Sequence, residues 1–361
     1  MNRGSGLKNW KNLHRTMTTN LTDRTAHFIH LSDRDDSALR DLLRHARNLK
    51  ADDYRERVAA GKTIGLIFLN PSLRTRISFE TAAVHLGAGT SIIQPGQGVW
   101  SFETRTGVVM DGDRTEHLKE AVQVISRYVD LIGVRAFAGM KDLDEDLEDR
   151  LLEDIVRYAT VPVINMESAR EHPCQALADG LTMLERFEGR PEGRKFVLSW
   201  APHPKPLPMA VPNSALEIAA RLGMDVTLAC PPEMKLPDTV LEQVEMHAVR
   251  NGSQLHVEHD QKAAFRDADI IYGKSWAAPL AYRDPTAEND LRTATYGNWT
   301  IDTKLMSLTN GAAFMHCLPV RRNVVVTDKV LDGPDAIHVD QAENRLHAQK
   351  AVLMKLMGLQ P

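Results

Sequence analysis

The stretch Ser72–Arg76 (SLRTR) places two hydroxyl groups and two guanidinium groups shortly after TIGLIFL, a predicted buried strand. A predicted helix, ISFETAAVHLG, follows at once. Backbone N–H groups and the helix dipole favour an anion at the start of a helix, and the two arginines reinforce that preference. The stretch therefore predicts a phosphate site, although the same pentapeptide away from a strand end would equally suit a solvated helix start.

Three further segments offer hydrogen-bonding groups of different kinds. Arg135 ends the predicted strand VDLIGVR, His172 and Gln175 lie in HPCQ, and His316 opens HCLPVRRN. A single histidine or arginine is more often a packing or surface residue, so their joint pattern carries the inference. In open α/β sheets ligands bind at the carboxyl ends of strands, where loops of this kind lie.

Short apolar runs alternate with helical periodicity from Ala26 onward, which indicates parallel β-α-β units. The alternation predicts an α/β protein with two doubly wound parallel-sheet domains joined by helices, at residues 26–171 and 172–342. We expect residues 1–25 to form a flexible tail. Residues 343–361 are expected to form an amphipathic helix that returns to the first domain.

The composition argues against several classes of protein. The 361 residues carry a formal net charge of −4, so an anionic ligand must meet local cations, and nucleic acid is not an expected partner. Three cysteines form neither a disulfide framework nor a metal-ligand spacing, which favours a reducing cytoplasm. No apolar run approaches the roughly 18 to 20 residues that span a bilayer, so no membrane association is expected. No G-x-G-x-x-G follows a strand, which argues against a dinucleotide-dependent oxidoreductase.

The segments SLRTR, GVR, HPCQ and HCLPVRRN occur in an order that resembles the aspartate/ornithine transcarbamylase family, over nearly all of the chain from Ala26 onward. The resemblance implies carbamoyl phosphate as first substrate and a homotrimer with active sites between subunits. Trp100, in GQGVW, resembles the residue that a neighbouring subunit inserts into the site. The resemblance implies that carbamoyl phosphate is bound by Ser72, Leu73, Arg74, Thr75, Trp100, Arg135, His172, Gln175, Cys317, Leu318 and Arg345. Arg135, His172 and Cys317 are the catalytic candidates among them.

The chemistry of carbamoyl transfer suits these assignments. The nucleophile would be a primary alkyl amine with an unperturbed pKa of about 10.4, and neighbouring cations would favour its neutral form. Negative charge then builds on the carbamoyl oxygen, where donors such as Arg135, His172 and Thr75 can stabilise it. Phosphate leaves and can accept the amine proton. This chemistry requires no metal and no organic cofactor, and none is expected.

Two features indicate the acceptor amine. The thiol and backbone carbonyls of HCLP suit an amine side chain better than the second carboxylate of aspartate. The DxxxSMG element with which ordinary ornithine transcarbamylases receive a free α-amino group is absent, and the corresponding strand ends in DADIIYGKSW with Lys274. A lysine there would repel an α-ammonium and attract an α-carboxylate, which suits ornithine with an acylated α-nitrogen. The resemblance implies that the acylornithine contacts are Glu167, His203, Lys274, Leu318 and Arg321.

The stretch WAPHPKPLPMAVP, residues 200–212, contains five prolines in thirteen residues. It resembles the loop that borders the acyl pocket in the acylornithine branch of the family, through which another segment threads as a backbone knot. Proline fixes φ, so such a loop stays open at little ordering cost. The alternative is a polyproline connector that touches nothing.

The acyl group is predicted from two positions. Acetyl-specific relatives carry a glutamate at the place of Thr115 and a lysine at the place of Val325, and this sequence has neither. A glutamate would oppose a succinyl carboxylate, whereas Thr115 beside Arg114 tolerates or attracts it. The sequence thus favours N-succinyl-L-ornithine as acceptor in arginine biosynthesis, with N-acetyl-L-ornithine as the alternative and free ornithine less favoured. A family member that binds carbamoyl phosphate without catalysis also stays open.

Overall fold

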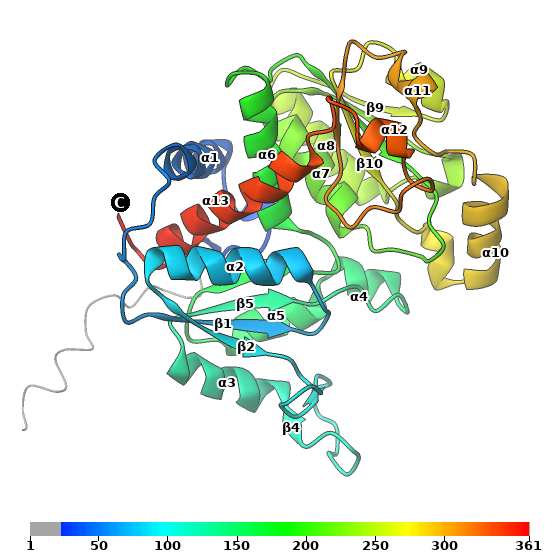
Figure 1. The fold of residues 1–361 in the computed structure, drawn as a ribbon. Helices are drawn as coiled ribbons and strands as arrows, with labels where there is room; N and C mark the ends of the chain where they lie inside the picture. The colour runs from blue at the N-terminus through cyan, green and yellow to red at the C-terminus, as the bar shows by residue number, and fades with distance from the viewer. Residues whose placement is uncertain (1–22, 361) are drawn as a thin grey trace, which may run out of the picture.

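Two parallel sheets form the centre of the protein, whose computed structural model describes residues 23–360 (Figure 1). The first sheet has the strand order β2-β1-β5-β6 and the second has the order β11-β10-β7-β8-β9. The predicted α/β class with parallel sheets is confirmed, whereas the backbone knot stays a prediction. The strands of the two sheets are β1 (Thr63–Phe68), β2 (Gly89–Ile93), β5 (Leu131–Arg135), β6 (Val163–Glu167), β7 (Lys195–Trp200), β8 (Asp225–Ala229), β9 (Leu255–Glu258), β10 (Ile270–Lys274) and β11 (Ala313–Met315).

Helices alternate with these strands along the chain. The α-helices are α1 (Asp36–Ala51), α2 (Leu73–Leu86), α3 (Leu118–Tyr128), α4 (Leu143–Leu147), α5 (Arg150–Tyr158), α6 (Pro173–Arg186), α7 (Ala210–Arg221), α8 (Asp238–Arg250), α9 (Gln261–Phe265), α10 (Pro285–Asp290), α11 (Thr303–Met306), α12 (Asp328–Leu331) and α13 (His338–Leu356). Within residues 23–360, no helix is both long and apolar enough to cross a membrane.

The expected tail, residues 1–25, is described only from residue 23 onward; residues 1–22 lie outside the described part of the chain. Arg24 belongs to a short 3-10 turn, Arg24–Ala26. Its guanidinium group forms an ion pair with Glu153 of α5 at 2.8 Å. The turn therefore contacts the first half of the protein.

The central strands are buried on both faces, which explains their continuous apolar runs. The last five residues of β1 are buried, and in β5 burial extends to Arg135 itself. Gly133 of β5 leaves no room for a side chain, because an added Cβ would lie 2.8 Å from Leu66 and 2.9 Å from Met166. Arg135 therefore stands at the carboxyl end of a closely packed strand.

The C-terminal helix α13 packs against α1, α2 and α6 (Figure 1). An amphipathic helix was expected here, but its polar residues Asn344 and Lys350 are buried as well. Lys350 Nζ donates to the carbonyl of Tyr54 at 2.9 Å, and Asn344 Nδ2 donates to Thr182 at 2.9 Å. The helix differs from the expectation because neighbouring helices cover more than one of its faces.

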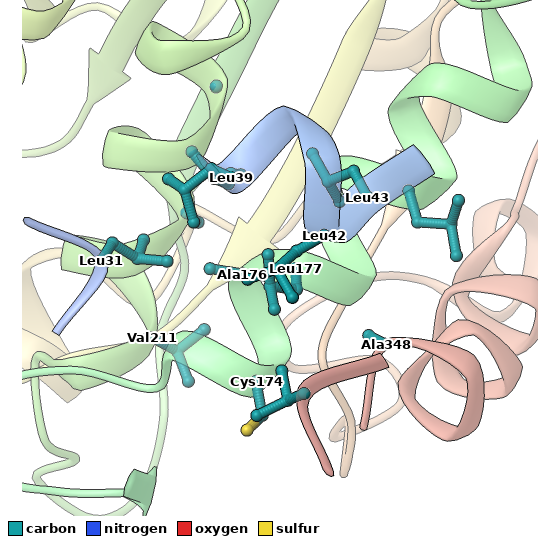
Figure 2. Close-up of a cluster of buried hydrophobic side chains, with 14 of the residues drawn as sticks. Leu31, Leu39, Leu42, Leu43, Cys174, Ala176, Leu177, Val211 and Ala348 are labelled. Carbon is teal, nitrogen blue, oxygen red and sulfur yellow. The ribbon is translucent and has the colours of Figure 1, made fainter. Parts of the chain in front are cut away.

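One hydrophobic cluster holds helices α1, α6 and α13 together. Figure 2 shows Leu42 and Leu43 of α1 together with Ala176 and Leu177 of α6, and Ala348 of α13 nearby. The same cluster includes residues from the strands of both sheets. The core therefore fixes the two halves relative to one another, and with them the loops at their strand ends.

Candidate active site

The predicted phosphate loop forms the first turn of α2. Ser72 is the N-cap of this helix, and its hydroxyl accepts a hydrogen bond from the Thr75 N–H at 3.2 Å. The buried Thr75 hydroxyl accepts from Arg345 at 2.7 Å and lies 3.5 Å from the Arg135 guanidinium. Residues from α2, β5 and α13, separated by up to 270 positions, thus meet at one helix N-terminus.

Three buried guanidinium nitrogens at this place have no hydrogen-bond partner among the described residues: Nε of Arg74, Arg135 and Arg345. Burial, together with the nearby Arg135 and Arg74 cations, lowers the pKa of Arg345 to about 10. Burial and the Arg135 cation also lower the pKa of Arg74. Buried polar groups are normally satisfied, so unpaired cationic donors at a helix N-terminus indicate a site for an anion.

Arg135 also contacts Glu167, which lies between it and His172. Its guanidinium group is hydrogen-bonded to the Glu167 carboxylate and lies 4.4 Å from the centre of the Phe137 ring. His172 Nε2 lies 3.3 Å from the same Glu167 carboxylate. Glu167 was expected on the acylornithine side, and in the structure its carboxylate lies against Arg135 and His172. It holds both groups at the carboxyl ends of β5 and β6.

His172 is the N-cap of α6 and is buried. Burial, and then the cations Arg345 and Arg135, lower its pKa well below the usual value. The imidazole is therefore neutral at physiological pH and adds hydrogen-bonding capacity without adding another positive charge. Its Nδ1 atom has no partner within residues 23–360. A neutral imidazole with one free nitrogen suits the uncharged carbamoyl group better than the phosphate.

A buried network joins the HPCQ and HCLP segments. Gln175 Nε2 donates to the Asp179 carboxylate at 2.7 Å, and Gln341 Nε2 donates to the same oxygen at 2.6 Å. Gln341 Oε1 in turn accepts from the His316 N–H at 2.9 Å. Burial raises the pKa of Asp179 to about 6. Sequence reasoning missed Asp179 and Gln341; the one available signal was the position of Asp179 four residues after Gln175 on a predicted helix.

The HCLP segment follows β11 and lies beside Lys274 of β10. Burial raises the pKa of the Cys317 thiol, and the Lys274 cation opposes this only in part, so the sulfur stays protonated. Lys274 Nζ donates to the Ser275 carbonyl at 3.1 Å. Leu318 has a φ of 57°, which a side chain other than glycine rarely adopts, and its N–H donates to His316 at 2.8 Å. The segment therefore holds a strained, defined conformation next to a cation.

The proline-rich loop is bound to neighbouring residues and is not an isolated connector. Ser275 donates to the carbonyl of Pro202 at 3.2 Å, and the Ala277 N–H donates to the carbonyl of Leu207 at 3.0 Å. His203 Nε2 accepts from Arg321 Nε at 2.9 Å. The structure thus brings two of the expected acylornithine contacts, His203 and Arg321, together.

Trp100 and Thr115 lie apart from this cluster. The Trp100 side chain is 69% exposed, and Thr115 is exposed as well. Both belong to the region around the short β3–β4 pair (Phe102–Glu103 with Glu116–His117), where Glu103 holds Arg105 at 2.9 Å. No contact within residues 23–360 connects either residue to the arginine cluster. Val325, the other expected specificity position, is buried with 2% exposure.

No metal site accompanies these residues. Over residues 23–360, three or more His, Cys, Asp or Glu side chains nowhere come together in a group that could hold a metal ion. The charged groups that converge are cations and one carboxylate, Glu167, and this set of donors suits an anionic ligand.

The segment before His172 is held by a buried ion pair. His30 Nδ1 lies 3.1 Å from the carboxylate of Glu171, and Glu153 is on its other side at 3.6 Å. Burial disfavours the charge of His30, but the hydrogen bonds with Glu153 and Glu171 outweigh burial and raise its pKa to about 10. The stability of this segment therefore depends on a protonated histidine.

We expect the free energy of unfolding to fall as the pH rises from about 6.5 to about 10. The pKa of His30 is higher in the folded state, so its contribution is complete below the unfolded value and is lost as pH passes the folded value. The wild-type protein should lose on the order of 2 kcal/mol between pH 7 and 9.5 in urea denaturation, and His30→Gln clearly less. His45→Gln is the control, because burial lowers the pKa of His45 and leaves it neutral throughout this range. An unchanged pH slope in His30→Gln would contradict the assignment.

Two family models match the chain. The carbamoyl-P binding domain of aspartate/ornithine carbamoyltransferase matches residues 26–185, and the Asp/Orn binding domain of the same family matches residues 209–356. The chain belongs to the aspartate/ornithine carbamoyltransferase family. It is a carbamoyltransferase, and the phosphate loop on α2 lies within the half that matches the carbamoyl-P binding domain.

Relatives of known activity cover almost the whole chain. N-acetylornithine carbamoyltransferase of Xanthomonas campestris pv. campestris is 45% identical over 335 residues, 92% of this chain and 98% of the relative. N-succinylornithine carbamoyltransferase of Bacteroides thetaiotaomicron is 39% identical over 328 residues, 88% of this chain and 95% of the relative. A solved N-acetyl-L-ornithine transcarbamylase, with one glutamate replaced by alanine and complexed with carbamyl phosphate and N-succinyl-L-norvaline, has a TM-score of 0.88 and 45% identity. It matches 91% of this chain and 99% of that one.

Proposed function

We propose that the protein transfers the carbamoyl group of carbamoyl phosphate to the side-chain amine of N-succinyl-L-ornithine, which gives N-succinyl-L-citrulline and phosphate in arginine biosynthesis. N-acetyl-L-ornithine is the alternative acceptor. The observation that carries the carbamoyl phosphate site is the set of unpaired guanidinium donors of Arg74, Arg135 and Arg345 at the N-terminus of α2. A phosphate dianion would satisfy them and the N–H groups of the first helical turn.

The reaction uses the groups around this anion site. The acceptor amine attacks the carbamoyl carbon, and the negative charge that develops on the carbamoyl oxygen is stabilised by Arg135 and the Thr75 hydroxyl. The neutral His172 hydrogen-bonds the carbamoyl group from the α6 side. The bond between carbon and the bridging oxygen then breaks, and phosphate leaves with the proton from the amine. The surrounding cations favour the neutral amine that the first step needs.

The acceptor side contains Lys274, Leu318, His203 and Arg321. Burial is the main cause that lowers the pKa of His172, His316 and His203, and the Lys274 cation adds to it in each case, so its charge acts on both substrate sides of the cluster. A cation there attracts an α-carboxylate and repels a free α-ammonium. Support for an acylated acceptor also comes from the relatives, which include both N-acetylornithine and N-succinylornithine carbamoyltransferases.

Thr115 supports succinyl over acetyl. In the acetyl-specific relatives we expect a glutamate at this position, and we take it to be the glutamate replaced in the solved variant that holds N-succinyl-L-norvaline. Threonine removes the negative charge that would face a succinyl carboxylate, and Arg114 adds a cation beside it.

We also propose a homotrimer in which a neighbour contributes Trp100 and Thr115. Exposed apolar side chains at Leu73, Ile77 and Val84 lie along one side of α2 at helical spacing. Such a stripe on the helix that starts with the phosphate loop fits burial against a second subunit. Leu73, an expected carbamoyl phosphate contact, would act through its backbone, because its side chain is 68% exposed.

The acceptor is tested by measuring phosphate release with carbamoyl phosphate and, in parallel, N-succinylornithine, N-acetylornithine and ornithine. We expect the highest kcat/KM with N-succinylornithine. Thr115→Glu should lower kcat/KM for the succinyl substrate by about tenfold or more, which corresponds to roughly 1.4 kcal/mol, and should change the acetyl substrate little. Thr115→Gln is the uncharged control. A wild-type preference for ornithine would overturn the acylated acceptor. A preference for N-acetylornithine would overturn the succinyl assignment and the role of Thr115 but leave the acylated acceptor in place.

A further inference from the structure

Arg292 is a buried arginine that neither the sequence motifs nor the proposed mechanism uses. It lies in a π-helical turn, Leu291–Thr295, directly after α10, and only 2% of the residue is exposed. Its Nε atom lies 3.1 Å from both carboxylate oxygens of Glu288, which is fully buried. Buried ion pairs of this kind often add little net stability compared with apolar residues of the same size. Stability alone therefore does not explain why Arg292 and Glu288 are buried here.

One of the two terminal nitrogens of Arg292 reaches the proline-rich loop, and the other stays within its own helical segment. One terminal nitrogen donates to the backbone carbonyl of His203, and the other donates to Asn289 at 3.2 Å. Pro202 and Pro204 flank His203 and have no N–H group, so regular backbone pairing cannot hold this part of the loop. Arg292 lies outside the loop and donates a hydrogen bond to the His203 carbonyl.

The side chain of His203 connects the loop held by Arg292 to Arg321 in the candidate acceptor site. Its Nε2 atom accepts from Arg321 Nε at 2.9 Å, and an arginine can only donate. Nε2 is therefore unprotonated, and Nδ1 lies 2.8 Å from the Lys205 carbonyl, where it can donate. Hydrogen bonds thus run from Glu288 through Arg292 and His203 to Arg321, which is exposed and would otherwise move freely.

We propose that Arg292, anchored by Glu288, is a positioning residue for the acceptor substrate: it fixes His203 in the proline-rich loop and thereby orients Arg321. The proposal rests on the proposed function for the identity of the acceptor. Arg292 lies behind the loop and acts through His203. Its hydrogen bonds go to Glu288, Asn289 and the His203 carbonyl, and none of them involves a residue of the phosphate loop, so Arg292 acts on the acceptor side.

The test is the steady-state kinetics of Arg292→Lys. Lysine keeps the charge beside Glu288 but loses the planar fork that reaches His203 at the same time. We expect the KM for the acceptor amine to rise about tenfold, with the KM for carbamoyl phosphate changed less than about twofold. Glu288→Gln, which loosens the anchor and keeps its shape, should raise the same KM by a smaller factor. If Arg292→Lys does not fold, the acceptor KM of Glu288→Gln tests the proposal instead.

Arg221→Lys is the matched control. Arg221 is equally buried, with 2% exposure, and pairs with Asp36 at 2.7 Å and Glu217 at 3.2 Å, away from the loop. Its replacement should lower the thermal midpoint and leave the acceptor KM unchanged. If the role of Arg292 is purely structural, Arg292→Lys and Arg221→Lys should behave alike, or Arg292→Lys should raise the KM for the acceptor and the KM for carbamoyl phosphate together. Either result would overturn the proposal.

A double-mutant cycle tests the path through His203. If Arg292 acts through His203, adding Arg292→Lys to His203→Gln should leave the acceptor KM of the single His203→Gln variant unchanged within about twofold. Additive effects would show that Arg292 acts by another route. Failure of the proposed function can be distinguished from failure of this proposal. If the wild-type protein prefers free ornithine, the proposed acceptor is wrong, and the same variants measured with ornithine still decide the role of Arg292.

Discussion

We expect Arg135→Met to lower kcat by about 10²–10³-fold, the range seen in other enzymes when one donor to a developing oxyanion is removed. Arg135 connects two parts of the site, because its guanidinium group contacts Glu167 and also reaches Thr75 at the phosphate loop. Methionine keeps the volume of the side chain and removes its donors. The measurement is phosphate release at saturating concentrations of both substrates.

Arg135→Met should remain folded. Arg74 and Arg345 remain close enough to Glu167 for electrostatic attraction in the variant, so the half-buried carboxylate keeps cationic neighbours. Loss of one cation also relieves repulsion within the cluster. We expect the thermal midpoint to change by only about 4 °C or less. A folded Arg135→Met protein with nearly full activity would refute the proposed site.

If the protein is the proposed trimer, we expect Trp100→Ala to abolish most activity, and we expect mixing it with Arg135→Met to restore part of that activity. Trp100 is exposed on its own chain and contacts none of the arginine cluster. If a neighbour supplies it, a mixed trimer contains sites with Arg135 from one subunit and Trp100 from the next. Random mixing of equal amounts makes about a quarter of all sites complete.

The complementation experiment requires the two inactive variants to be unfolded and refolded together. Activity near a quarter of the wild-type value is expected, against almost none when each variant is refolded alone. Val109→Ala is a control, since Val109 is 77% exposed in the same region and no role is assigned to it. Full activity of Trp100→Ala, or no recovery on mixing, would show that each chain completes its own site.

Much of the anion site could be predicted from the sequence because it lies where predicted strands end and predicted helices begin. Ser72, Thr75, Arg135 and His172 occupy such positions, and parallel strands bring their carboxyl ends to one edge. The packing of α13 was harder to predict from the sequence. Its hydrophobic spacing predicted a helix, but not that Lys350 on the same helix would be buried.

The residues that sequence reasoning missed act through contacts between distant positions. Asp179 and Gln341 are 162 residues apart, and Arg292 and the His203 carbonyl are 89 apart. A lone buried polar residue in a helix has no local signal, because its partner is known only once the fold is known. Trp100 and Thr115 could be named from resemblance, but their contacts depend on a second subunit that a single chain does not contain.

The C-terminal helix α13 has a consequence for how the enzyme comes into being. Gln341 and Arg345 lie one turn apart on this helix, and they reach the Asp179 network and the Thr75 hydroxyl respectively. A chain is synthesised from its N-terminus, and its domains generally fold in that order. A nascent chain can therefore complete both sheets and still lack two of the groups at the proposed active site, so we expect carbamoyl transfer to begin only after the final helix has left the ribosome and docked.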